Sequence, residues 1–190
     1  MTKPSQNLSV ALLHDGMHDK QGAIVTTSLT MMDVHDICRS CRTYGAQSFY
    51  IAHPSSVLRA LASTLERHWK EGYGASYNPD RKDAFDILHI TETLDQIKEA
   101  VQEKTGKSPC LVATSAHDGG MRVTFPALRE QMIGDSDRHY LLLLGTGWGM
   151  SQDLLDQTDL FLEPIQGPTE YNHLSVRSAC AIMLDRLFGT

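Results

Sequence analysis

The apolar run Leu141–Leu144 is the feature of the sequence that most restricts its fold. Four leucines follow Tyr140 without a polar residue between them, and Gly145 ends the run. A short strand without alternation of polar and apolar side chains is typical of a parallel sheet that helices cover on both faces. We therefore expect a parallel sheet with this strand in its interior.

The rest of the chain alternates between strand and helix patterns. Strands are predicted at 8–14, 48–53, 84–90, 110–116, 139–145 and 160–165, and helices at 30–44, 54–70, 93–103, 124–133, 151–157 and 173–189. A polar loop containing Gly16 and Gly22 follows the first strand, and the segment 71–83 has the composition of a loop. This order predicts an α/β fold with a largely parallel sheet, right-handed crossovers and flanking helices.

Length and composition predict one domain over residues 1–190, with residues 1–7 as a flexible tail. A chain of 190 residues with 41% hydrophobic residues can bury one sizeable core. No apolar stretch approaches the roughly 20 residues of a membrane span, and the first ten residues do not resemble a signal peptide. We expect a cytoplasmic protein without a membrane partner.

The cysteines and the net charge restrict the functions further. Cys38, Cys41, Cys110 and Cys180 are too scattered for a disulfide framework, so reduced thiols are expected. The CxxC pair at Cys38 and Cys41 has no second pair, which disfavours zinc, and no metal is required. The net charge of −6 means that any contact with nucleic acid must use a local basic group.

Three predicted strands end in residues that suit a ligand site. These strand ends are Thr114 with Ser115, the glycine turn 145–149, and the turn 163–167. Ligands of open α/β sheets bind beyond the carboxyl ends of the strands, so one site built from these turns is predicted. Ordinary strand-to-helix turns are the alternative. The sequence GTGWGMSQ lacks the Lys of a phosphate-binding loop and the Gly spacing of a dinucleotide fingerprint.

The motifs LLLLGTGWG, LEPIQG and YNHLSVRSACAIMLDRL resemble the three C-terminal motifs of the SPOUT class of RNA methyltransferases. The segment DVHDICRSCRTYGA resembles the first motif of that class, with Asp33, Arg39 and Gly45 at its spacing. From about Leu8 to Gly189 the chain is most similar to a small stand-alone bacterial SPOUT family, sometimes fused to the tRNA guanine-N1 methyltransferase.

The resemblance implies an S-adenosylmethionine-dependent methyltransferase that acts on RNA, with a deep trefoil knot over about 110–190. It also implies a homodimer through the knot and the C-terminal helix. The cofactor-binding residues that it implies are Thr114, Ser115, Leu144, Gly145, Thr146, Gly147, Gly149, Leu162, Glu163, Pro164, Ile165, Gly167, His173 and Leu174. In such a site the glycines keep side chains out of the ligand's space, and the apolar residues pack on the adenine.

The same resemblance implies Arg39, Asp33, His173 and Ser175 as catalytic residues. Arg39 would contact the RNA, or it would pair with Asp36 or Glu66 on the surface. Asp33 would be a general base or a helix cap, His173 would take a proton or hold the knot, and Ser175 would cap the last helix. The expected RNA-binding residues are Arg39, Arg42, Tyr73, Tyr77, Asn78 and Arg81, a mixture of cations and stacking side chains.

Two other functions stay open at this level. A non-catalytic dimeric module that binds S-adenosylmethionine or RNA would agree with the acidic net charge. It would also agree with Asp33 and His173, which stand where many enzymes of the resembled class have asparagine. A nucleotide-dependent oxidoreductase is disfavoured by the spacing of the glycines. Trp148, inside the glycine turn, would be a wall of the cofactor site, a core anchor or a dimer contact.

Overall fold

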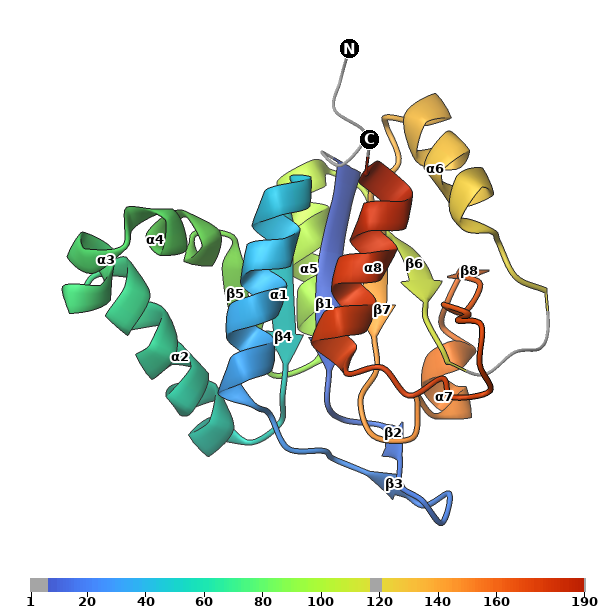
Figure 1. The fold of residues 1–190 in the computed structure, drawn as a ribbon, viewed down its shortest axis with the longest axis horizontal. Coiled ribbons are helices and arrows are strands. Elements are labelled where there is room, and N and C mark those ends of the chain that lie inside the picture. The colour runs from blue at the N-terminus through green and yellow to red at the C-terminus, as the bar shows by residue number, and fades with distance from the viewer. Residues whose placement is uncertain (1–6, 117–120, 190) are drawn as a thin grey trace.

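A parallel six-stranded sheet forms the centre of the computed structural model, which describes residues 7–116 and 121–189. Its strands are β1 (Leu8–Leu13), β4 (Ser48–Ala52), β5 (Leu88–Thr91), β6 (Cys110–Ala113), β7 (Tyr140–Leu144) and β8 (Leu160–Phe161). They lie in the order β5-β4-β1-β7-β6-β8, and every pairing is parallel (Figure 1). The predicted fold class is confirmed, with the leucine strand β7 between β1 and β6.

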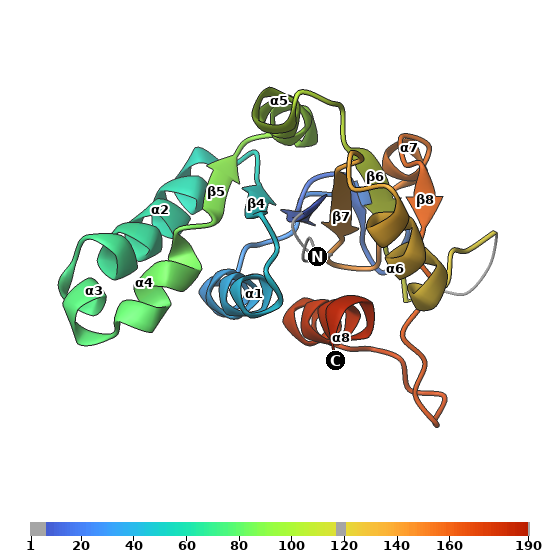
Figure 2. The same cartoon turned by 90° about the horizontal axis from the view of Figure 1, so that it is seen from above.

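Helices cover both faces of the sheet, as the leucine run requires. Leu142 and Leu144 face α1 (Met31–Tyr44), α6 (Phe125–Gly134) and α8 (Val176–Phe188). Leu141 and Leu143 face α5 (Leu94–Thr105) and α7 (Gln152–Leu155) on the opposite side (Figure 2). Both sets of side chains are therefore buried, and no polar alternation is needed along β7.

The last helix, α8, is apolar over much of its circumference because it has several neighbours. It lies beside α1, contacts α6 and buries Cys180, Met183, Leu184 and Leu187 against the sheet (Figure 2). The thiol of Cys180 contacts that of Cys41, and burial raises the pKa of Cys41 well above its ordinary value. Packing within one chain therefore accounts for much of the apolar surface of this helix.

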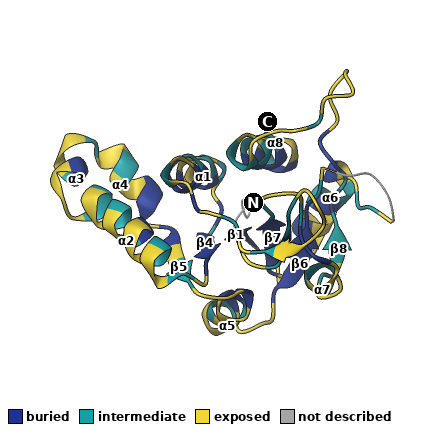
Figure 3. Cartoon of the chain, turned by 90° about the horizontal axis from the view of Figure 1, so that it is seen from below, coloured by how far each residue is buried: buried dark blue, intermediate teal, exposed yellow. Residues whose placement is uncertain are grey.

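A helical lobe follows β4; its first helix was predicted at 54–70, and its other two replace the predicted loop and the start of the predicted strand at 84–90. It consists of α2 (Ser56–Lys70), α3 (Tyr73–Tyr77) and α4 (Pro79–Phe85), and much of its surface is exposed (Figure 3). The loop prediction was wrong because Asn78 caps α4 with its side chain and Pro79 occupies the first turn. The expected strand at 84–90 begins only at Leu88, since Phe85 ends α4.

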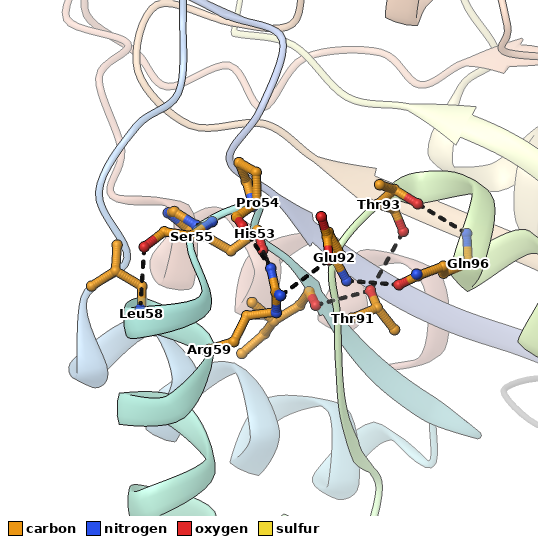
Figure 4. Close-up of polar contacts among 10 residues, drawn as sticks. His53, Pro54, Ser55, Leu58, Arg59, Thr91, Glu92, Thr93 and Gln96 are labelled. Atoms are coloured by element: carbon orange, nitrogen blue, oxygen red, sulfur yellow. Dashed lines mark hydrogen bonds and ion pairs between the residues drawn. The ribbon is translucent and has the colours of Figure 1, made fainter.

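Arg59 fixes this lobe to the carboxyl end of the sheet. Its guanidinium donates hydrogen bonds to the carbonyls of His53 and Pro54, both at 2.7 Å, and pairs with Glu92 at 3.0 Å (Figure 4). The turn after β4 is thereby joined to the turn after β5. The lobe thus has a defined position relative to the strand ends.

The polar loop after β1 contains a hairpin that was not predicted. Strands β2 (Met17–His18) and β3 (Ile24–Val25) pair antiparallel, and each has only two residues. At the chain start, Asn7 belonged to the expected flexible tail, but its amide donates to the carbonyl of Met132 at 3.0 Å. The other tail residues, 1–6, lie outside the described residues. Within residues 7–116 and 121–189, no helix has the length and apolar character needed to cross a membrane.

Candidate functional site

A cavity of about 790 Å³ lies at the carboxyl ends of β6 and β7. This volume falls within the range of about 300–1,000 Å³ that is typical of ligand pockets. The lining residues are Thr27, Ser28, Asp33, 114–116, 144–149, Ile165, Glu170, 172–177, Ala179 and Met183. Strands β7, β6 and β8 are neighbours, so the turns after them meet at one edge of the sheet.

The structure brings most of the expected cofactor-binding residues to this cavity. Thr114, Ser115, Leu144, Gly145, Thr146, Gly147, Gly149, Ile165, His173 and Leu174 line it, whereas Leu162, Glu163, Pro164 and Gly167 do not. Leu162 is fully buried, and its N–H donates to Ala113 at 2.9 Å. The Glu163 carboxylate accepts from the N–H of Phe125 at 2.7 Å. These two residues hold the third turn and the start of α6.

The glycine turn after β7 is held against the β2–β3 hairpin by the backbone. The N–H of His18 donates to Gly149 at 2.8 Å, and the N–H of Trp148 donates to His18 at 3.0 Å. Gly147 has a φ of 61°, and a Cβ there would lie 2.9 Å from the carbonyl oxygen of His18. The hairpin itself therefore requires glycine at this position, in addition to the ligand space expected from the sequence.

Two threonines connect the wall of the cavity to a buried histidine. The Thr146 hydroxyl donates to the carbonyl of Leu13 at 3.1 Å and lies 2.5 Å from the Thr27 hydroxyl, which is 3.1 Å from His14 Nδ1. The Thr27 hydroxyl also donates to the carbonyl of His14 at 3.3 Å, so two backbone carbonyls and the contact between the threonines share the two hydroxyl protons.

His14 is held neutral at the base of this chain of hydroxyls. The residue is 1% exposed, and its pKa is lowered to about 4, first by burial and then by the charge of His53. Its Nε2 atom is buried and has no hydrogen-bond partner within the described residues. Sequence analysis placed His14 only at the end of the predicted strand 8–14, and nothing in the pattern indicated its link to Thr146.

An ion pair crosses the cavity wall from α1 to α8. Arg177 donates from Nη1 to Asp33 Oδ1 at 2.9 Å, and its Nε lies 3.6 Å from Asp36 Oδ2. Asp33 also accepts from the hydroxyl of Thr30 at 2.5 Å, so each of its oxygens has a donor. Arg177 is the single Lys or Arg among the described residues that line the cavity. The sequence analysis missed it, and its sole signal was its place two residues after Ser175.

Arg39 and Arg42 are exposed on α1 and do not line the cavity. Arg39 instead borders a shallow depression with Asp36, Ser40, Thr43 and Tyr44. Its expected surface partner, Asp36, pairs with Arg177. A role for Arg39 at a cofactor in this cavity would therefore have to come from a second copy of the chain.

His173, Ser175 and Trp148 lie at the rim of the cavity. The ring of His173 lies 5.4 Å from that of Tyr171, and the Ser175 hydroxyl accepts from the N–H of Ser178 as the cap of α8. Trp148 is half exposed and lines the cavity, so it is not a core anchor. The amide of Asn172 donates to Ala116 at 2.9 Å, which ties this rim to the turn after β6.

The remaining expected RNA-binding residues lie on the helical lobe, outside the cavity lining. Tyr73 and Tyr77 are exposed and stack on each other with ring centroids 5.8 Å apart. The guanidinium of Arg81 lies 4.6 Å from the centroid of the Trp69 ring. Asn78 caps α4, so its side chain has a structural partner.

No group of three or more metal-ligating side chains occurs in the parts of the chain that the structure describes. The four cysteines are free and buried. Burial is also the main cause that raises the pKa of the Cys110 thiol to about 11.

Known proteins with similar sequences cover nearly the whole chain. A protein of Aquifex aeolicus is 39% identical over 185 residues, which are 97% of this chain and 90% of that protein. A tRNA (guanine-N(1)-)-methyltransferase of Oleidesulfovibrio alaskensis is 38% identical over 187 residues. These are 98% of this chain and 43% of that enzyme, so the chain spans less than half of its length.

Solved structures with the same fold include SpoU methyltransferases. The SpoU methyltransferase AviRb of Streptomyces viridochromogenes, in complex with AdoMet, has a TM-score of 0.58 at 14% identity and covers 96% of this chain and 60% of its own. The TrmH/SpoU tRNA modifying enzyme of Aquifex aeolicus has a TM-score of 0.55 at 18% identity and covers 97% and 75%. At these identities the similarity establishes the fold.

The family model that describes SAM-dependent RNA methyltransferases matches residues 7–189. This match extends over the sheet, the glycine turn and α8, which together form the cavity. S-adenosylmethionine is the cofactor of this family, and RNA is its substrate. The chain belongs to the family of SAM-dependent RNA methyltransferases.

Proposed function

We propose that the protein methylates a nucleotide of tRNA or rRNA, with S-adenosylmethionine bound in the cavity at the ends of β6 and β7. The observation that carries this proposal is the meeting of the turns 114–116 and 144–149 with the segment 172–177 around one cavity. We propose further that the segment 110–190 forms the trefoil knot that holds the cofactor, within one domain over residues 1–190.

The lining of the cavity fits the cofactor chemically. Ile165 and Leu174 offer apolar surface to an adenine, and the backbone of 144–149 offers N–H and C=O groups to the polar parts of the molecule. The carboxylates of Asp33 and Glu170 favour a positively charged sulfonium. Leu162 and Glu163 support these residues by holding the third turn in place, and Pro164 and Gly167 belong to the same turn.

S-adenosylmethionine supplies a methyl group that its sulfonium already activates. The protein must then orient the acceptor atom, exclude water and accept any proton that the acceptor loses. Asp33 and His173 both border the cavity, and we assign the proton to one of them. Ser175 orients the rim as the cap of α8, and Arg39 approaches the cofactor of a partner chain in a homodimer built on the knot and α8.

We assign the first contact with RNA to the helical lobe. Tyr73 and Tyr77 present exposed rings to unpaired bases, and Arg81 on the same lobe and Arg42 on α1 add positive charge to an acidic protein. A tRNA substrate agrees with the activity named for the relative from Oleidesulfovibrio alaskensis. Such a substrate places the protein in the cytoplasm.

Calorimetric titration with S-adenosylmethionine, S-adenosylhomocysteine and NAD in parallel tests the cofactor site. We expect binding of the two methionine-derived ligands and none of NAD. Absence of binding by both would remove the cofactor from the cavity and the proposed activity with it. Transfer of a labelled methyl group to in vitro transcribed tRNA then tests the reaction.

A non-catalytic module is the second candidate, and one observation favours it. Both oxygens of Asp33 already accept hydrogen bonds, from Thr30 and Arg177, so a substrate proton has to compete with these two donors for the carboxylate. Such a module would bind S-adenosylmethionine or RNA but transfer no methyl group. The methylation assay separates the two candidates.

A further inference from the structure

We propose that Arg177 binds a phosphate of the RNA substrate, and that this phosphate replaces the Asp33 carboxylate as the partner of its guanidinium. The proposal rests on the RNA-methylating function proposed above. It assigns a substrate contact to the same chain that forms the cavity, whereas Arg39 would act from a partner chain.

Arg177 has the position and the donors for this contact. Its side chain is 33% exposed, so solvent and ligand reach it, and it belongs to the first turn of α8 at the cavity wall. Nη1 and Nε face Asp33 and Asp36, and Nη2 makes no hydrogen bond to any part of the chain that the structure describes. When the bond to Asp33 opens, Nη1 and Nη2 together form one free edge of the planar guanidinium, which can bind a phosphate with two parallel hydrogen bonds.

The other charged side chains of the described cavity lining are negative, so the positive charge of this guanidinium is important for phosphate binding. The lining includes the carboxylates of Asp33 and Glu170, and the whole chain has a net charge of −6. A phosphate that enters the cavity is therefore repelled by two groups, and Arg177 is the one Lys or Arg of the described lining that attracts it. Without Arg177, the negative charge of the cavity would oppose the substrate.

The exchange of partners explains how Asp33 becomes available. Thr30 holds Oδ2 of Asp33, and Asp36 holds Nε of Arg177, so each side chain keeps one partner when the bond between them opens. Asp33 Oδ1 is then uncovered at the cavity wall. A phosphate thus frees the carboxylate at the moment when the nucleotide arrives, which removes the observation that favoured a non-catalytic module.

The first test measures the salt dependence of RNA affinity. Wild-type protein saturated with S-adenosylhomocysteine is titrated with in vitro transcribed tRNA over a series of NaCl concentrations. Loss of one phosphate contact lowers the slope of log K against log [NaCl] by about 0.7–0.9. We expect this decrease for Arg177→Gln and a retained slope for Arg177→Lys. Arg186→Gln removes the same charge from the exposed end of α8 and should leave the slope unchanged.

The second test examines the exchange itself. Asp33→Asn removes the competing carboxylate, so we expect tRNA to bind several-fold more tightly while methyl transfer decreases. Asp95→Asn on α5, whose partner is Lys98, removes the same charge on the opposite face and should change neither quantity. Weaker or unchanged tRNA binding by Asp33→Asn would overturn the exchange.

The outcomes separate this inference from the proposed function. If the wild-type protein binds no tRNA, the proposed function fails and the inference falls with it. If the wild type binds and methylates tRNA but Arg177→Gln keeps the full salt slope, the inference alone is overturned. Weaker binding of S-adenosylhomocysteine by Arg177→Gln, with unchanged tRNA binding, would assign the guanidinium to the cofactor carboxylate and also overturn it. Thermal melting checks the fold of each variant. Where Arg177→Gln unfolds because it leaves the Asp33 carboxylate unpaired, the double variant Asp33→Asn/Arg177→Gln replaces it, and its salt slope is compared with that of Asp33→Asn alone.

Discussion

The two ends of the central sheet each hold a buried neutral histidine, and the two have different surroundings. His14 follows β1 at the carboxyl end, and His139 precedes β7 at the amino end. Burial is the main cause that lowers the pKa of each to about 4. His139 Nε2 lies 2.9 Å from the hydroxyl of Ser9, whereas His14 is linked through Thr27 to the cavity wall. Burial determines the protonation of both, and position decides which one connects to the site.

Acid should destabilise the protein through both histidines. Each folded pKa of about 4 lies below the ordinary value of 6.5, so the unfolded chain binds more protons between these pH values. This stabilisation is complete above pH 6.5 and is lost as the pH falls to 4, amounting to about 3 kcal/mol for each histidine. Urea unfolding at a series of pH values measures it.

Single variants separate the two ends in that experiment. His14→Asn and His139→Asn should each lower the slope of unfolding free energy against pH by up to about 1.4 kcal/mol per pH unit. We expect S-adenosylhomocysteine affinity to decrease in His14→Asn alone, since His14 is linked through Thr27 to Thr146 at the cavity wall, whereas His139 contacts Ser9 at the other end of the sheet. Equal effects of both variants on this affinity would contradict the assignment of the two ends.

Two glycines with positive φ extend the comparison of the sheet ends. Gly106, which ends α5 before β6, has a φ of 77°, and Gly147 after β7 has a φ of 61°. A Cβ at Gly106 would meet no atom within 4 Å, but one at Gly147 would lie 2.9 Å from the His18 carbonyl oxygen. Gly106 is therefore required only for its left-handed backbone conformation. Gly147 is required for this conformation and also for the close approach of the β2–β3 hairpin.

Gly147→Ala should therefore be more harmful than Gly106→Ala. The left-handed conformation costs an alanine about 1–2 kcal/mol at either position. The contact with a backbone carbonyl adds about 1–3 kcal/mol at Gly147 and displaces the turn, so we expect at least a tenfold loss of S-adenosylmethionine affinity there. Urea unfolding and calorimetry measure both effects. Similar losses in the two variants would show that the hairpin does not restrict the turn.

The sequence predicted the sheet and its helices because their signals are local. Leu141–Leu144 indicated a strand buried on both faces, and the apolar spacing at 30–44 indicated a helix, which the structure confirms as α1 with Thr30 and Gly45 as its caps. The helix α2 was predicted, but α3 and α4 of the helical lobe were missed because the glycines and polar residues of this segment outweighed the start signal of Asn78 and Pro79. The two-residue strands of the hairpin are too short to show a period.

The site was predictable only where strand ends determine it. The turns after β6 and β7 were placed at one edge by the parallel order, and their residues do line the cavity. Asp33 and Arg177 are 144 positions apart, and only the packing of α1 on α8 brings them together. The resemblance thus predicted the type of site, whereas Arg177 could be identified as the partner of Asp33 only from the structure.

The smallest expected effect concerns the hydroxyl of Thr27 between His14 and Thr146. Thr27→Val keeps the shape of the side chain but removes the bonds to both neighbours, which weakens cofactor binding by about 1 kcal/mol, or roughly fivefold. Thr27→Ser should restore the affinity because it retains the hydroxyl. Ser9→Ala breaks the corresponding bond at the amino end, and it should lower stability by a similar amount without changing affinity. If Ser9→Ala also weakened the binding of S-adenosylmethionine in calorimetry, the two ends of the sheet would be coupled, and the cavity would depend on the whole sheet instead of its own turns.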